Sequence, residues 1–119
     1  MKTVNILGTE YTIEIVKASE CELLKKNNWC GSCNDLINRI LIGDPSEEEV
    51  FGVMSEEEQK LQIQRTLRHE IVHAFFNESG LQDDALVLGS GWARNEEMID
   101  WIAIQSPKLF QAFKEADCI

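Results

Sequence analysis

The sequence predicts a single α+β domain in which short strands come first and helices follow. Residues 4–42 contain alternating and β-branched segments that favour strands, whereas residues 55–116 carry apolar residues at helical spacing. At 119 residues the chain is long enough for one hydrophobic core and too short for two. We therefore expect residues 1–119 to form one domain, with a short antiparallel sheet packed against the helices.

The N-terminal segment predicts a β-hairpin. Residues 4–16 form two strand-like runs on either side of Gly8, which suits a tight turn. In the second run Tyr11, Ile13 and Ile15 alternate with polar residues, so one face of the hairpin is expected to be buried and the other solvated.

A third strand is predicted further along, over residues 33–42, which are rich in leucine and isoleucine. Residues 19–27 before it favour a helix or an irregular turn. Gly43-Asp44-Pro45 ends the strand, and residues 46–54 read as an acidic connector.

A long helix is predicted from Ser55 to Asn77. Ser55 and Glu58 have the spacing of a capping box, in which each side chain bonds the other residue's backbone N–H. Gly80 is well suited to the position that follows a helix. Apolar residues recur between these ends at roughly helical spacing, namely Leu61, Leu67, Ile71, Val72, Ala74 and Phe75.

Near the end of this helix lies His69-Glu70-Ile71-Val72-His73, an H-E-x-x-H that contains both histidines of the protein. Residues four apart share one helix face, so two imidazoles can hold one metal ion. Glu70 then lies beside the metal, where it can take a proton from water, as in zinc metallopeptidases. The alternative is that both histidines are ordinary core or surface residues.

A second predicted helix begins at Asn95 and supplies a third ligand. Catalytic zinc uses three protein ligands plus water, and two histidines with one glutamate is a known set. Glu96 and Asp100 share a face, so Glu96 can bind the metal while Asp100 accepts the free N–H of a zinc histidine. Glu97, about 100° round the helix, is the competing ligand. The alternative is an acidic helix start that merely complements the helix dipole.

The same helix is expected to place Met98, Ile99, Ile102 and Ala103 in the core and to end at Ser106-Pro107. A separate last helix is predicted over residues 109–116, with Phe110 and Phe113 packed inward.

These motifs together resemble the gluzincin arrangement typified by thermolysin, and more closely the small ImmA/IrrE-type metallopeptidases of bacteria, phages and mobile elements. The likeness runs roughly from Gly31 to Gln105, although Asp100 stands where many such proteins carry asparagine. It implies a zincin-like fold and one zinc per chain, held by His69, His73 and Glu96, with Glu70 as general base. It also implies a substrate that is often one particular regulatory protein.

Composition narrows the possible partners. Twenty-one acidic and 11 basic residues give a net charge of −10, which disfavours nucleic acid and anionic membrane surfaces. No signal peptide is visible, and no apolar run approaches the ~20 residues of a membrane span. We therefore expect a cytoplasmic protein with no nucleic-acid or membrane partner. The protein or peptide substrate is what the H-E-x-x-H motif and the resemblance imply.

In that compartment the four cysteines are expected to be reduced thiols. Cys30 and Cys33 form a C-x-x-C, which leaves two alternatives open. One is a structural zinc site completed by Cys21 and Cys118, and the other is a redox dithiol.

The expected activity is that of a zinc-dependent metalloendopeptidase. The alternative is a catalytically silent metal-binding interaction protein encoded by a phage or mobile element. Residues 36–42 are the candidate edge strand for the substrate, and the loop from Gly80 to Gly91 is a candidate cover for the site. Tyr11, Arg68 and Arg94 are candidates for stabilising an oxyanion.

Overall fold

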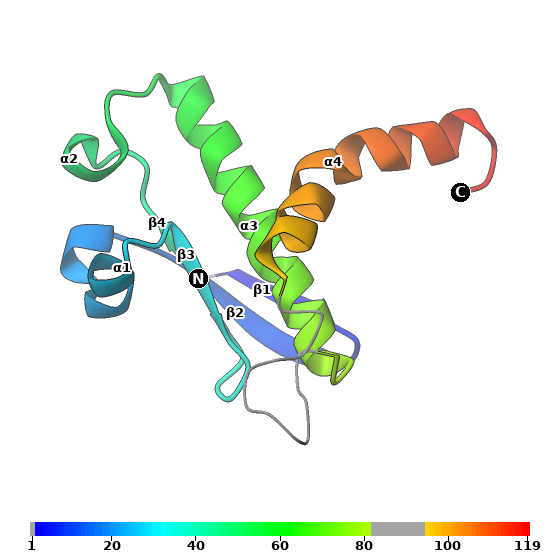
Figure 1. Ribbon diagram of the computed structural model, residues 1–119, viewed down its shortest axis with the longest axis horizontal. Helices are drawn as coiled ribbons and strands as arrows, with labels where there is room; N and C mark the ends of the chain where they lie inside the picture. The colour runs from blue at the N-terminus through cyan, green and yellow to red at the C-terminus, as the bar shows by residue number, and fades with distance from the viewer. Residues whose placement is uncertain (1, 82–94) are drawn as a thin grey trace.

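The computed structural model describes residues 2–81 and 95–119 and has a mixed α+β fold (Figure 1). Within these residues, one four-stranded sheet has the order β1-β2-β4-β3. Its strands are β1 (Lys2–Ile6), β2 (Thr9–Val16), β3 (Gly31–Asn34) and β4 (Arg39–Gly43). The helices are η1 (Ala18–Glu20, a 3₁₀ turn), α1 (Glu22–Asn27), α2 (Glu48–Phe51), α3 (Glu56–Glu78) and α4 (Glu96–Glu115). The predicted α+β class, with strands first and the long helices after them, is confirmed.

The N-terminal hairpin is confirmed. β1 and β2 pair antiparallel, and Leu7 and Gly8 between them have φ of 49° and 94°, the backbone of a type I′ turn. Tyr11 and Ile13 are buried as predicted. Ile15 is 52% exposed, because on this strand the core cluster ends at Ile13.

The prediction of one strand over residues 33–42 is wrong. The segment turns back on itself, and β3 pairs antiparallel with β4 in a register that sets Gly31 opposite Ile42. The turn forms because the Asn34 side chain accepts a hydrogen bond from the backbone N–H of Leu36 at 3.0 Å, and Asn38 adopts a left-handed φ of 54°.

Two consequences follow for the sheet. β2 and β4 run parallel, so the sheet is mixed, not antiparallel throughout as predicted. β4 lies inside the sheet and β3 lies at its edge, so the predicted edge strand over residues 36–42 is also wrong.

The long helix matches its prediction at both ends. The Ser55 hydroxyl accepts from the Glu58 N–H at 3.1 Å, and the Glu58 carboxylate accepts from the Ser55 N–H at 3.0 Å. At the other end, Gly80 has a φ of +71°, which a glycine adopts without steric cost. This carboxyl-terminal end is anchored to the sheet because Glu78 accepts hydrogen bonds from the hydroxyls of Thr9 and Tyr11, at 2.8 and 2.7 Å.

α3 packs across one face of the sheet. Its Ala74 lies in the core beside five strand residues, namely Ile6, Tyr11, Ile13, Ile40 and Ile42. The predicted apolar stripe is only partly inward. Leu61 is 56% exposed because the first turns of α3 extend beyond the sheet (Figure 1), and Phe75 is 40% exposed.

The predicted helix end at Ser106-Pro107 is wrong, because α4 continues through Pro107 to Glu115. A proline inside a helix leaves the carbonyl four residues earlier without its backbone donor. That carbonyl belongs to Ala103, and the guanidinium of Arg68 on α3 donates to it. The Ala103 carbonyl thereby has a hydrogen-bond donor, and the same bond joins α4 to α3.

Beyond Pro107 the helix leads away from α3 (Figure 1). Phe110 is accordingly 55% exposed, so the prediction that it packs inward is wrong. In the first half of α4, Ile99 and Ala103 are fully buried as predicted, whereas Met98 and Ile102 are only partly buried.

The remaining connections are short. Residues 46–54, predicted as a connector, include α2, and residues 19–27 include α1. The predicted loop from Gly80 to Gly91 lies, after Leu81, outside the described residues. Among the helices of the described part, none has the length and apolar character needed to cross a bilayer.

Candidate metal centre

Three side chains with metal-binding atoms meet between α3 and α4. The Nε2 atoms of His69 and His73 lie 3.2 Å apart. The two Glu96 carboxylate oxygens lie 3.0 Å from His69 Nε2 and 3.2 Å from His73 Nε2. The three residues therefore offer ligand atoms to a common point from two different helices.

These separations fit a small cation. A tetrahedral zinc ion about 2.1 Å from each nitrogen or oxygen ligand separates neighbouring ligand atoms by about 3.4 Å. The observed separations of 3.0 to 3.2 Å are close to that value. His69 and His73 are largely buried, and Glu96 is more exposed, so the point where they meet is open on one side.

Local sequence explains why Glu96 reaches the histidines. Asn95 caps α4 by accepting the Met98 N–H at 2.8 Å, which starts the helix at Glu96. Burial of Ile99 one turn later fixes the face that α4 presents to α3. Glu96 is therefore the acidic residue of α4 that meets both histidines, as the helical-face argument favoured over Glu97.

Asp100 lies where the sequence predicted it. Its Oδ1 is 2.7 Å from Nδ1 of His69. With Nδ1 carrying the proton, the ring donates to Asp100 and turns the lone pair of Nε2 toward His73 and Glu96. In that tautomer Asp100 orients the His69 ring so that Nε2 faces His73 and Glu96.

Glu70 is buried between α3 and the sheet, with only 5% of its surface exposed. Burial, reinforced by the negative charges of Glu96 and Asp100, raises the pKa of Glu70 to about 8. Its neighbour on the sheet is Gly31 of β3. A Cβ at Gly31 would lie 3.2 Å from Glu70 Oε1 and 2.8 Å from Thr66 Cγ2, so only glycine fits there without a shift.

Gly31 is a residue whose role the sequence analysis missed. Glycine inside a strand often marks a close approach of another group, and Gly31 stands between two cysteines in just such a run. Because residues 33–42 were predicted as one strand, Gly31 was left outside it and this signal was not used.

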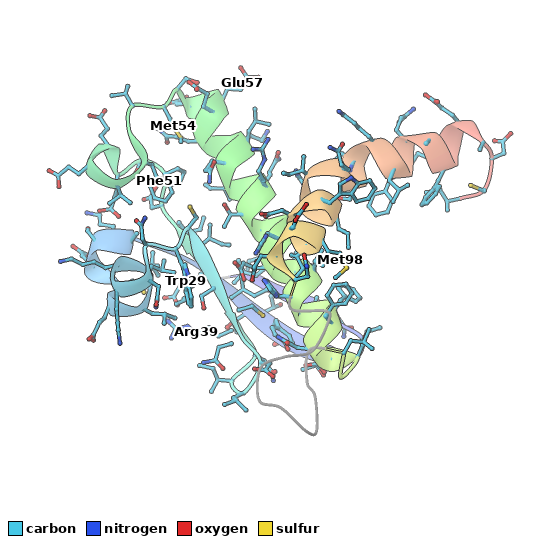
Figure 2. The ribbon with its side chains drawn as sticks, in the orientation of Figure 1. Trp29, Arg39, Phe51, Met54, Glu57 and Met98 are labelled. Carbon is cyan, nitrogen blue, oxygen red and sulfur yellow. The ribbon has the colours of Figure 1, made fainter. Side chains whose placement is uncertain are left out.

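The histidines, Glu70, Glu96 and Asp100 share one cleft of about 640 Å³. β3 forms one wall and α3 forms another, and Trp29, which Figure 2 labels, lines the cleft two residues before β3 begins. The other lining residues are Asn28, Cys30, Gly31, Ser32, Cys33, Gln62, Arg65, Thr66 and Asn77.

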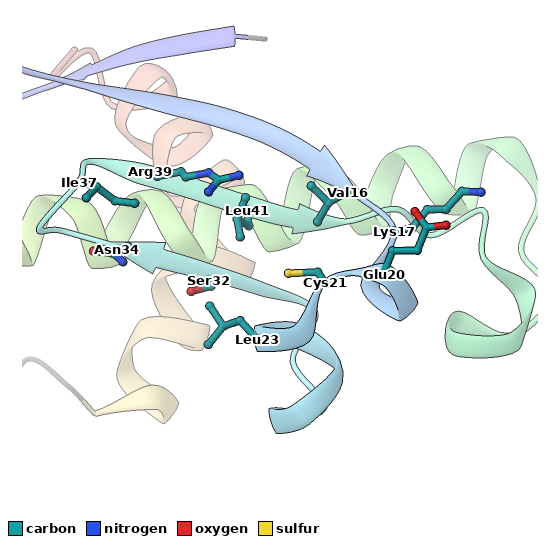
Figure 3. Close-up of a pocket in the computed structure, with 10 residues that line it drawn as sticks. All are labelled: Val16, Lys17, Glu20, Cys21, Leu23, Ser32, Asn34, Ile37, Arg39 and Leu41. Carbon is teal, nitrogen blue, oxygen red and sulfur yellow. The ribbon is translucent and has the colours of Figure 1, made fainter.

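A second hollow of about 540 Å³ lies on the opposite face of the sheet (Figure 3). Alternate strand residues point to opposite faces, so Asn34, Arg39 and Leu41 line this hollow while Cys33 lines the cleft. Cys21 and Leu23 close its other side. Neither histidine lines this hollow, and Ser32 lines both it and the cleft.

All four cysteines are free thiols. Cys30 and Cys33 line the cleft, whereas Cys21 lies on the other face of the sheet, so the four do not assemble into one metal site. Burial, followed by the charge of Glu70, raises the pKa of both cleft thiols, that of Cys33 to about 12. Cys33 lies in β3 and Cys30 directly precedes that strand, so the pair is not at a helix N-terminus. A redox dithiol typically has a lowered thiol pKa and a place at a helix N-terminus, and this pair has neither.

Two of the predicted oxyanion donors are engaged elsewhere. Tyr11 is fully buried and donates its hydroxyl to Glu78, and Arg68 donates to the Ala103 carbonyl. Arg94 lies outside the described residues.

No protein-family model, curated protein or solved structure matches this chain. What the site can do chemically therefore follows from its own side chains. His69, His73 and Glu96 could hold a metal ion, and the buried carboxylate of Glu70 lies in the same cleft.

Proposed function

We propose that this chain is a zinc-dependent metallopeptidase that cleaves a peptide bond in a specific protein partner, with a zincin-like site of the ImmA/IrrE type. The observation that carries the proposal is the convergence of His69, His73 and Glu96 at ligand spacing, with Glu70 buried beside them. An i, i+4 histidine pair alone is common, but the third ligand from a separate helix is what zinc chemistry requires.

Each residue then has one task. His69, His73 and Glu96 hold the metal, and Asp100 fixes the His69 ring through Nδ1. Zinc, when bound, polarises a carbonyl group and acidifies water. Glu70 takes a proton from the attacking water and passes it to the leaving amine. A cation nearby offsets the charges of Glu96 and Asp100, so Glu70 ionises more readily in the loaded protein.

The substrate is proposed to lie along β3. One side of β3 is hydrogen-bonded to β4, and the cleft lies beside the strand. An extended peptide that adds as a further strand there gains main-chain hydrogen bonds and passes close to Glu70, because Gly31 brings the β3 backbone against that carboxylate.

A metal-binding protein that does not cleave is the second candidate. It is favoured by one observation: Tyr11 and Arg68, two of the groups proposed to stabilise an oxyanion, bond elsewhere in the fold. The same metal ligands serve both candidates, and only Glu70 separates them.

The test compares zinc-loaded wild type with zinc-loaded Glu70→Gln on a pool of proteome-derived peptides, with new termini identified by mass spectrometry. The peptidase predicts new termini with the wild type and, at equal zinc content, at least about a hundredfold fewer with Glu70→Gln. No new termini from the wild type would favour the non-cleaving candidate. Equal sets of termini from both proteins would show that Glu70 is not the general base.

The third ligand has a matched control one residue away. Glu96→Gln and Glu97→Gln remove the same charge from the same helix turn. We expect Glu96→Gln to weaken zinc affinity by at least about tenfold and Glu97→Gln to leave it near that of the wild type, as measured by competition with a chelator. The reverse order would move the ligand to Glu97.

A further inference from the structure

The cleft beside the metal centre is acidic, with one exception. Its charged lining residues are Glu70, Glu96, Asp100 and Arg65, so Arg65 is the single lysine or arginine among the described lining residues. Arg65 is thus a positive charge within an acidic cleft, in a chain whose net charge is −10.

Arg65 is also the described arginine that the fold leaves unengaged. Arg39 pairs with Glu14 at 2.6 Å, and Arg68 donates to the Ala103 carbonyl. No carboxylate in the described part of the chain lies within ion-pair distance of Arg65, and its side chain is exposed. A guanidinium in an open cleft, with no carboxylate of its own, is suited to an anion from outside.

The position of Arg65 on α3 fixes its distance from the proposed metal site, where the peptide bond would be cut. Arg65 precedes His69 by four residues and shares its helix face, about 6 Å along the axis. An extended peptide advances about 3.3 Å per residue, so that offset corresponds to about two residues of a bound strand. Arg65 can therefore contact a substrate group that is close to the cleaved bond but not part of it.

We propose that Arg65 binds a carboxylate of the substrate about two residues from the scissile bond, so that the peptidase selects peptides with an acidic group at that position. The proposal rests on the function proposed above and names its substrate class. The carboxylate comes from an aspartate or glutamate side chain or from a free C-terminus. Both offer the same two oxygens to the guanidinium, and the arms of the test separate them.

The test measures binding without turnover, in the zinc-loaded Glu70→Gln protein. Fluorescent peptides capped at both ends carry a single glutamate at successive positions, and each has a glutamine counterpart. A second pair ends in a free carboxylate or in an amide. We expect one acidic peptide to bind about 10- to 100-fold more tightly than its neutral counterpart, the effect of one charge-assisted hydrogen-bonded pair.

Matched variants assign the preference. Arg65→Ala should abolish the acidic preference, and Arg65→Glu should invert it toward a peptide with lysine at the selected position. Lys60→Ala removes the same charge from the same helix at an exposed position outside the cleft, and the preference should survive it.

Equal affinities for acidic and neutral peptides would overturn the proposal, as would a preference that survives Arg65→Ala or no measurable binding by any acidic peptide. A preference only for the free C-terminal carboxylate would support it with the C-terminus as the source. If wild type fails to cut the peptide that Arg65 selects, the peptidase function fails while recognition by Arg65 stands.

Discussion

The buried carboxylate of Glu70 is predicted to lower the stability of the metal-free protein at neutral pH, and replacing it with glutamine is predicted to stabilise that form. Glu70 is 5% exposed and faces the negative charges of Glu96 and Asp100. Glutamine has nearly the same shape and carries no charge, so it removes the electrostatic cost and keeps the packing against Gly31.

The magnitude follows from the pKa. In the folded protein the pKa of Glu70 is about 8, against 4.5 for an unperturbed glutamate. The folded state therefore holds this proton more tightly than the unfolded state, and the free energy of unfolding falls as pH rises from about 4.5 to about 8. At about 1.4 kcal/mol per pH unit, Glu70 destabilises the metal-free fold by roughly 3 kcal/mol at pH 7.

The assay is urea denaturation in the presence of a chelator, followed by tryptophan fluorescence at pH 5 and pH 7. Glu70→Gln should be more stable than wild type by roughly 3 kcal/mol at pH 7 and by less than about 1 kcal/mol at pH 5. Glu57→Gln, at the exposed first turn of α3 (Figure 2), removes an equal charge and should not stabilise the protein. A stability gap of the same size at both pH values would refute the reasoning.

Three further outcomes are predicted. Gly31→Ala should lower the free energy of unfolding by about 1–3 kcal/mol, because its Cβ would lie 2.8 Å from Thr66, and a denaturation midpoint equal to that of wild type would contradict this. Asp100→Asn should weaken zinc affinity about 10- to 100-fold in a chelator competition, because His69 loses its charged acceptor, and unchanged affinity would show that Asp100 does not orient the ring. Unfolded casein should be cut poorly compared with one protein partner, since a shallow open cleft offers little general binding energy, and rapid zinc-dependent digestion of casein on a gel would contradict this selectivity.

Much of the site was predictable because it depends on short-range helix geometry. The spacing of His69 and His73 places both on one face whatever the rest of the fold does. The same holds for Glu96 and Asp100, whose helix begins at the Asn95 cap. Burial of Ile99 and Ala103 holds α4 in place beside α3. The apolar spacing of these two residues had also indicated that they are buried.

The errors lie where tertiary contacts override a local signal. Pro107 ordinarily ends a helix, but α4 continues because Arg68, on another helix, satisfies the carbonyl that the proline leaves without a donor. A bond between residues 68 and 103 cannot be anticipated from the residues around the proline.

The sheet edge was misassigned for a different reason. The turn between β3 and β4 depends on Asn34 and Asn38. Leu36 and Ile37 between these asparagines, and the apolar residues 40–42 after them, made the whole segment resemble one continuous strand. Without that turn, β3 and its contact with Glu70 through Gly31 could not be placed.

The zinc content of purified protein tests the central claim most directly. Zinc is measured by atomic emission in the wild type, Glu70→Gln and His73→Ala proteins. The comparison distinguishes His73 as a metal ligand from Glu70 as the general base. The account predicts about one zinc per chain in the first two proteins and well below one in His73→Ala, since two ligands hold zinc far less tightly than three. Full zinc in His73→Ala would contradict the account, because the metal would then be bound elsewhere.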